Sequence, residues 1–198
     1  MPVKRLQRSA ILGVALAGMV YVRCVGATDA RDMDESCRNF VEQFYNLYEP
    51  LEPGHTLEFT SLGDAVEKKQ VDPELGEHLR VVLDAQANGG QTLLDFDPII
   101  NGRDPADRYL TGSVTRKGEH YLVEVYGVSD DGRKHDKPDV IAELVFQTGE
   151  WTFVNFHYPN RADSPENENL LSMLKRIRKS LGKENHPQPA GVPEGAPR

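Results

Sequence analysis

Cys37 is the residue best suited to nucleophilic chemistry, because it lies near the start of a predicted helix, where the helix dipole lowers a thiol pKa. His157 and Asn155 lie on a predicted strand that could pack beside this helix and supply a base. Cys37 also falls on the apolar side of the helix with Phe40 and Phe44, where a cysteine is usually an unreactive packing residue. We therefore favour a buried thiol and keep a hydrolase that uses Cys37 with His157 as an alternative.

Two glutamates on predicted strands form a second possible site. Glu124 and Glu143 could act as acid and base in a pocket, with the Tyr126 hydroxyl group beside them. Isolated glutamates in strands are more often solvated or paired with arginine, so this pocket enzyme is also kept as an alternative. For ligand or partner binding we select six residues of the strands and the loop before them: Asp97, Arg108, Glu124, Tyr126, Asn155 and His157.

A loop rich in oxygen-bearing side chains invites comparison with calcium sites. Its members are Asp95, Asp97, Asn101, Asp104 and Asp107. An EF-hand loop needs glycine at its sixth position and glutamate at its twelfth, but counting from Asp95 these positions hold Ile100 and Ala106. The six histidines have no close pair and no cysteine neighbour, which is not zinc-site spacing. We expect the carboxylates to serve turns and caps, and we expect neither a metal nor a cofactor.

Alternating apolar residues and two-residue turns predict a four-stranded antiparallel meander. The predicted strands are Leu110–Arg116, Glu119–Val128, Val140–Gln147 and Glu150–Tyr158. The turns are Lys117-Gly118 and Thr148-Gly149.

A two-residue turn at Thr148-Gly149 fixes the pairing of the last two strands. The expected pairs are Phe146 with Trp151, Leu144 with Phe153, Ala142 with Asn155 and Val140 with His157. This face is the expected core, with Trp151 as an anchor, and the reverse face includes Glu143 and Phe156. In the first hairpin, the same alternation places Leu110 and Val114 on one face with the valines of the next strand. One half of the predicted sheet is therefore more apolar than the other. A curved sheet with one polar, concave region is where we expect a ligand pocket or a partner surface.

Apolar residues at spacings of three and four predict helices before and after the sheet. The predicted helices begin near Ser36, Ser61, Pro73 and Ser164. The fold class is therefore α+β, with N-terminal helices packed on a curved antiparallel sheet and a C-terminal helix.

Composition and the two ends of the chain suggest a secreted protein of one domain. The sequence has 198 residues and 38% hydrophobic content, and its N-terminus has basic residues, an apolar run and small residues at Val25-Gly26-Ala27. We expect a signal peptide at 1–27, a single domain at 28–182 and a disordered tail at 183–198, which is rich in proline and glycine. Lipid anchoring at Cys24 is less favoured, because Tyr21-Val22-Arg23 are not the small residues that precede a lipidation site.

The charge balance narrows the class of partner. The formal net charge is −8, and removal of a signal peptide containing Lys4, Arg5, Arg8 and Arg23 makes it more negative. This acidity argues against binding of nucleic acid or anionic lipid. The apolar run is also short for a membrane span, so we expect no stable membrane insertion.

Several local strings, in this order, resemble a bacterial family of secreted and lipoprotein domains of unknown function. They are Pro73-Glu74-Leu75, Leu94–Pro98, Val123–Gly127, Lys137–Glu143 and Trp151–Pro159. The resemblance covers about Ser36 to Lys179. It implies a cystatin-like fold, also called nuclear transport factor two-like, and a place in the cell envelope. It supplies no catalytic residues. The function we expect is therefore binding of a small ligand or an envelope protein in the concave region of the sheet, in the periplasm or outside the cell.

Overall fold

The chain folds as an α+β domain in which one long helix crosses a four-stranded antiparallel sheet. The computed structural model describes residues 26–51, 60–89, 91–159 and 169–184. Its elements are α1 (Gly26–Leu47), α2 (Ser61–Glu67), α3 (Pro73–Gly89), β1 (Arg108–Lys117), β2 (His120–Val128), β3 (Val140–Gln147), β4 (Glu150–His157) and α4 (Leu170–Glu184). The predicted fold class is confirmed. The predicted signal peptide up to residue 25, the predicted helix start at Ser164 and the tail beyond residue 184 lie outside the described residues.

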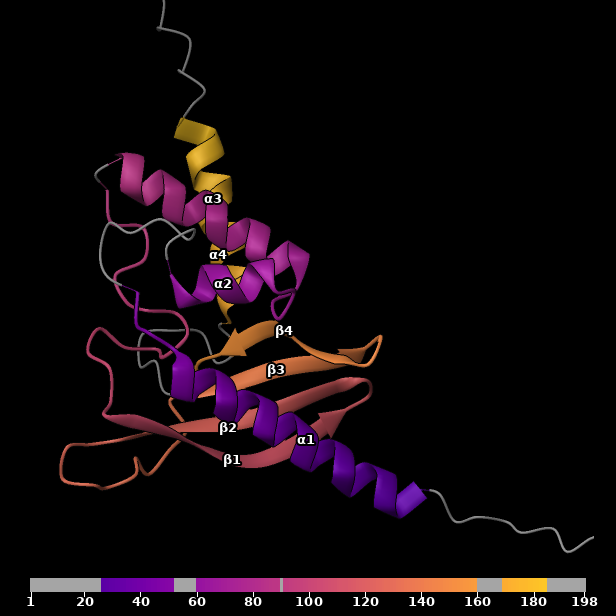
Figure 1. Ribbon diagram of the computed structural model, residues 1–198. Coiled ribbons are helices and arrows are strands. Elements are labelled where there is room, and N and C mark those ends of the chain that lie inside the picture. Colours follow the sequence, from indigo (N-terminus) through magenta and orange to yellow (C-terminus); the bar gives the residue numbers. More distant parts are fainter. Residues whose placement is uncertain (1–25, 52–59, 90, 160–168, 185–198) are drawn as a thin grey trace, which may run out of the picture.

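The helices divide into two groups around the sheet. Figure 1 shows α1 lying across the strands, while α2, α3 and α4 gather beyond β4. The strands follow one another in the order β1-β2-β3-β4, as the two predicted hairpins require. The face of the sheet that packs against α1 is called the inner face here, and the opposite face is called the outer face.

The ends of the helices are set by side chains that bind free backbone N–H groups. Thr60 caps α2 by accepting a hydrogen bond from the Gly63 backbone N–H at 3.0 Å, one residue before the predicted start. Asp72 caps α3 in the same way through the Glu74 N–H at 2.9 Å, and Pro73 takes the first helical position. These caps fix where α2 and α3 begin.

That connection is also tied to the last strand. The Phe153 N–H donates to the Gln70 carbonyl at 2.8 Å, and the Asp72 N–H donates to the Phe153 carbonyl at the same distance. Val71 thereby forms a short parallel bridge with Phe153. The α2–α3 segment is therefore fixed beside β4 by backbone hydrogen bonds as well as by packing.

The turn between β3 and β4 forms where it was predicted. Thr148 and Gly149 both have positive φ, 54° and 90°, as expected for a tight hairpin turn. In the first hairpin, Lys117 pairs with His120, so the turn residues are Gly118 and Glu119 rather than Lys117 and Gly118.

A β-bulge in β4 changes the predicted register. The pairs Phe146–Trp151 and Leu144–Phe153 are as predicted, but Val154 is an extra residue beyond them. Ala142 therefore faces Phe156 instead of Asn155, and His157 faces Ile141 instead of Val140. The bulge turns Phe156 into the core, where its side chain is fully buried, and it transfers His157 to the outer face.

A second bulge, in β1, has the same effect on the first hairpin. The register shifts between Thr111 and Val114, which have Val125 and Val123 as partners. Leu110 then pairs with Tyr126, so it lies on the outer face and not beside Val114 as predicted. Each of the two errors of register arises from one inserted residue, because the side-chain period of a strand is two.

The core lies between α1 and the inner face. Phe153 is fully buried at its centre, with ring centroids 4.7 Å from Phe44, 5.3 Å from Phe40 and 5.2 Å from Phe156. Trp151 is also buried, as predicted, and its ring lies 4.9 Å from Tyr121. The region beneath α1 is thus filled by side chains.

Candidate functional site

Cys37 and His157 lie on opposite sides of the sheet. Cys37 is a fully buried member of the core under α1, and burial, with a smaller effect of the Asp34 charge, raises its pKa to about 12. His157 lies on the outer face because of the bulge in β4. The structure therefore does not bring together the thiol and the histidine of the hydrolase alternative, and the thiol has almost no nucleophilic thiolate at neutral pH.

His157 instead meets Glu143. Its Nε2 atom lies 2.7 Å from Glu143 Oε2, and His120 Nδ1 lies 2.8 Å from the other carboxylate oxygen. The Glu143 side chain is only 19% exposed, and the hydrogen bond to His157 is the main cause that lowers its pKa below the ordinary value. Two residues that the sequence suggested for separate alternatives thus form one cluster, completed by a third that was not selected, His120.

Glu124 and Tyr126 form a second cluster on the outer face. Glu124 Oε2 accepts hydrogen bonds from the Ser113 hydroxyl at 2.6 Å and the Tyr126 hydroxyl at 3.0 Å. The Ser113 hydrogen bond is the largest cause that lowers the Glu124 pKa. Lys134 Nζ lies 3.7 Å from the centre of the Tyr126 ring. A carboxylate with a lowered pKa remains ionised at neutral pH, which suits a charge partner better than a general acid.

The remaining selected residues have different roles. Asp97 is a buried loop anchor, 5% exposed, that accepts hydrogen bonds from the Tyr48 hydroxyl and the Leu51 N–H, and burial raises its pKa. Asn155 accepts hydrogen bonds from the N–H groups of Phe156 and Leu171, so it joins β4 to α4. Arg108 is exposed at the start of β1. The structure therefore does not gather these three around one ligand site.

The acidic loop contains an ion pair between Arg103 and Asp95. Arg103 lies 2.9 Å from the Asp95 carboxylate. Within the described residues, no group of three or more histidine, cysteine or acidic side chains is arranged to hold a metal ion.

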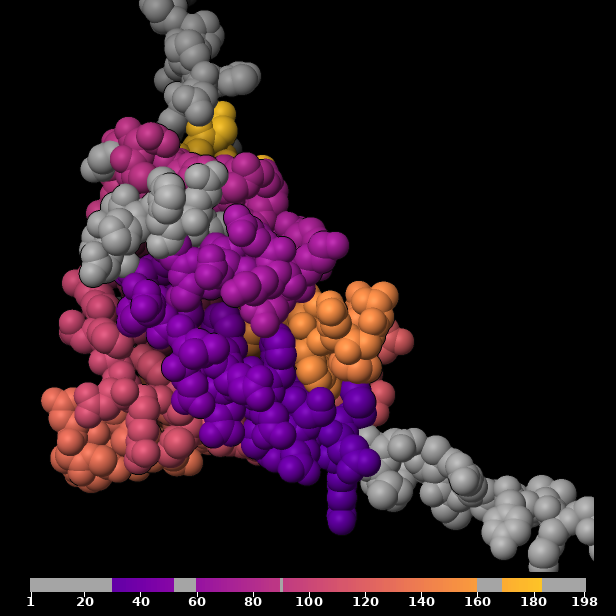
Figure 2. All heavy atoms as spheres, in the orientation of Figure 1, coloured from indigo at the N-terminus to yellow at the C-terminus, as the bar shows by residue number. Residues whose placement is uncertain are grey.

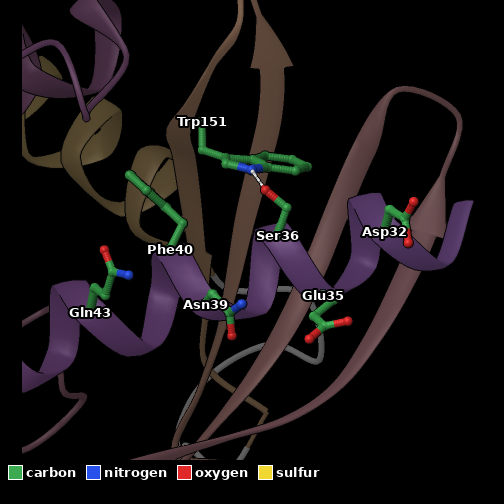
Figure 3. Close-up of a pocket in the computed structure, with 7 residues that line it drawn as sticks. All are labelled: Asp32, Glu35, Ser36, Asn39, Phe40, Gln43 and Trp151. Carbon is green, nitrogen blue, oxygen red and sulfur yellow. Dashed lines mark hydrogen bonds between the residues drawn. The ribbon is translucent and has the colours of Figure 1, made fainter. Parts of the chain in front are cut away.

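A depression beside α1 was not identified from the sequence. It has a volume of about 450 Å³ and is open to solvent. Its lining residues are Asp32, Glu35, Ser36, Asn39, Phe40, Gln43 and Trp151. Figure 3 shows Ser36 and Phe40 pointing from α1 toward Trp151, whose indole Nε1 donates a 3.0 Å hydrogen bond to the Ser36 hydroxyl.

A second depression continues the first between α1 and α2. It has a volume of about 200 Å³ and shares Phe40 and Gln43 with the first. Its other lining residues are Phe44, Leu47, Tyr48, Ser61, Asp64, Ala65, Lys68 and Gln70. We call the two depressions together the α1 trough. In Figure 2 the indigo surface of α1 borders the magenta surface of α2 and the orange hairpin of β3 and β4, where the trough lies.

The exposed large apolar side chains of the described residues lie in or beside the α1 trough. Among the described residues, only Leu47 and Phe146 are large hydrophobic side chains that are exposed, by 80% and 40%. Leu47 lines the trough, and the Phe146 ring lies 4.9 Å from Trp151 at its other end. Exposed apolar side chains that border a depression are a common feature of binding surfaces.

Three amide side chains in the trough have no internal hydrogen bond. Asn39, Gln43 and Gln70 all line it, and their side chains bond to no other residue of the part of the chain that the structure describes. Each amide offers both a donor and an acceptor. The trough thus combines apolar walls with unused hydrogen-bonding groups, which is the usual composition of a ligand site.

The signal for this site was present in the sequence as two adjacent rows on one helix. Residues four apart on a helix lie above one another. One row contains Asp32, Ser36, Phe40, Phe44 and Tyr48, and the next contains Glu35, Asn39, Gln43 and Leu47. Phe40 and Phe44 of the first row are predicted on the apolar side of the helix, and the exposed margin beside them was missed.

Comparison with known proteins adds no relative: no family model, no curated protein and no solved structure matches this chain. Among the described helices, none has the length and the apolar character needed to cross a membrane.

Proposed function

We propose that this chain is a binding domain of the bacterial cell envelope or the secreted fraction, and that the α1 trough is its binding site. The observation that carries the proposal is the position of Leu47 and Phe146, the two exposed large apolar side chains of the described residues: Leu47 lines the trough, and Phe146 contacts Trp151, which also lines it. Full burial of one such side chain stabilises a complex by about 1.5–3 kcal/mol. A partner that covers the trough therefore gains affinity from surface that is otherwise in contact with water.

The chemistry of the ionisable groups supports binding rather than catalysis. The raised pKa of Cys37 disfavours a thiolate nucleophile. The lowered pKa values of Glu124 and Glu143 disfavour proton donation at neutral pH. Binding beneath α1 is disfavoured because Cys37, Val41 and other core side chains fill that region.

The proposed location rests on the order of residues at the N-terminus. Basic residues, an apolar run and Val25-Gly26-Ala27 precede Thr28, as in a secretory signal. N-terminal sequencing of the protein from an envelope fraction is expected to begin near Thr28. Recovery from the cytosol with Met1 or Pro2 at the N-terminus would contradict this location.

The binding site can be tested with N-phenyl-1-naphthylamine, an uncharged dye whose emission rises in apolar surroundings. The dye is expected to bind the native protein, and Leu47→Asn is expected to weaken binding about fivefold or more through loss of apolar contact. Because Leu47 is 80% exposed, this change should leave the fold intact. Leu122→Asn, on the half-buried outer face, is the matched control and should have no effect. Weaker dye binding by Leu122→Asn and unchanged binding by Leu47→Asn would place the binding site on the outer face.

A further inference from the structure

We infer that the α1 trough binds an extended peptide segment that carries basic side chains at one end and apolar side chains at the other. This inference rests on the proposed function and names the chemistry of its partner. It follows from the dimensions of the trough, its distribution of charge and its unused amide groups.

The length of the trough suits an extended chain. It extends along α1 from Asp32 to Leu47, which is about 22 Å at the helical rise of 1.5 Å per residue. An extended peptide advances about 3.3 Å per residue, so six or seven residues cover this distance. Because the trough is an open depression and not an enclosed cavity, a chain can lie along it without a change in the fold.

Charge is unevenly distributed along the trough. Asp32 and Glu35 are exposed carboxylates that line the trough at the end near Trp151. Figure 3 shows them on the part of α1 next to Ser36. At the other end, Asp64 and Lys68 lie 3.8 Å apart and offset one another. The first end is therefore negative, in a chain with a formal net charge of −8, and it complements lysine or arginine in a partner.

Apolar surface is concentrated at the opposite end. Phe44 and Tyr48 are half-buried there, with ring centroids 5.5 Å apart, and Leu47 is exposed beside them. This end complements leucine, phenylalanine or similar side chains. The negative and the apolar ends together give the partner a direction.

The amide groups between the two ends favour a polypeptide over a lipid chain or a simple aromatic compound. Asn39 and Gln43 are one helical turn apart on α1, and Gln70 lies on the opposite wall. A peptide backbone presents alternating donors and acceptors, and side-chain amides can satisfy both. A hydrocarbon chain would leave these groups unpaired, which lowers its affinity.

Synthetic octapeptides without tryptophan provide the direct test. One has two lysines at one end with leucine and phenylalanine at the other, and its matched control has two glutamates in place of the lysines. Trp151 is the sole tryptophan, so its emission reports binding at the trough, and calorimetry measures the affinity. The lysine peptide is expected to bind about fivefold more tightly or better at low salt, with a smaller difference at high salt. Equal affinities at low salt would overturn the inference.

Charge variants of the protein test whether the lysine peptide is recognised by Asp32 and Glu35. Asp32→Asn with Glu35→Gln should weaken binding of the lysine peptide about fivefold and leave the glutamate peptide no weaker. The matched control, Glu42→Gln with Glu67→Gln, removes the same charge from exposed positions that do not line the trough. An equal loss in both double variants would show a general effect of net charge and would contradict a site at Asp32 and Glu35.

The outcomes separate this inference from the proposed function. If the dye binds in a manner that depends on Leu47 but neither peptide displaces it, the trough is a site for small apolar compounds and the peptide inference fails. If Leu47→Asn affects neither the dye nor the peptides, both the proposed function and the inference fail.

Discussion

The outer face of the sheet and the α1 trough both contain polar groups, but only one of them leaves these groups unused. On the outer face, Glu143 is held between two histidines and Glu124 between two hydroxyl groups. In the trough, amide side chains have no partner among the described residues, and an apolar side chain is exposed beside them. A polar cluster with internal hydrogen bonds stabilises a fold, whereas solvent-accessible amides without an internal partner, beside exposed apolar surface, are available to a binding partner. The difference explains why the residues most suggestive of chemistry are not those most suited to binding.

The largest expected effect is the difference in thiol reactivity between the two sides of α1. In a Cys24→Ser chain, the pKa of about 12 gives Cys37 about a thousandfold less thiolate near pH 8 than a thiol of ordinary pKa 9.0. Cys37 should therefore react with a disulfide reagent only after denaturation, while a second thiol introduced by Asn39→Cys in the trough should react at once. Rapid reaction of Cys37 in the native protein would show that the region under α1 is open.

Trp151 belongs to both regions, because it lies in the core and also lines the trough. Trp151→Ala is expected to lower the free energy of unfolding by about 3–5 kcal/mol, since it removes a large buried aromatic side chain. Leu47→Ala, at an exposed position, should change it by less than about 0.5 kcal/mol. Urea unfolding followed by circular dichroism measures both. A small effect of Trp151→Ala would mean that its contacts belong to the trough alone.

Asp97 tests whether a residue selected for binding is instead structural. Asp97→Ala leaves the half-buried Tyr48 hydroxyl and the Leu51 and Ile99 N–H groups without their acceptor. The expected loss is about 2–3 kcal/mol of the free energy of unfolding. Asp104→Ala, at an exposed position in the same loop, serves as the control and should be nearly neutral. Equal stabilities of the two variants would return Asp97 to the list of binding candidates.

Glu143 gives a smaller effect with a defined dependence on pH. Its folded pKa is lower than the ordinary value of 4.5, so its stabilising contribution is present above that value and is lost as the pH falls through the folded pKa. Glu143→Gln should therefore cost about 1 kcal/mol at neutral pH, and the difference from the parent should shrink below about pH 4.5. Chemical unfolding at a series of pH values provides the measurement. A difference that grows on acidification would have the wrong sign for a carboxylate stabilised by His120 and His157.

Much of the fold could be predicted from short-range signals. The Thr148-Gly149 turn predicted one hairpin and the pairs Phe146–Trp151 and Leu144–Phe153, and the Asp72-Pro73 pair marked the start of α3. The bulges could not be predicted, because Phe156 and Asn155 each suit a position facing the core or its margin. Burial of Phe156 and the hydrogen bonds of Asn155 to the start of α4 decide between them, and both depend on residues distant in sequence.

The candidate site was predictable only in part for the same reason. His157 and Glu143 were identified singly, but their contact exists because Val154 is inserted in β4. The two rows of α1 residues can be derived from helical spacing alone. That Trp151 and α2 form the opposite wall of the trough depends on long-range packing, which the local pattern does not contain.

The backbone bridge between Phe153 and the α2–α3 connection has a consequence for assembly. β4 is an edge strand, and an exposed edge offers unpaired N–H and C=O groups to another chain. Here Gln70 and Asp72 already use the backbone groups of Phe153, and Val154 interrupts the row beside them. At the other edge, β1 is bulged, and Arg38 donates to the Gly112 carbonyl at 3.2 Å. Both edges thus resist strand addition and the aggregation that follows from it.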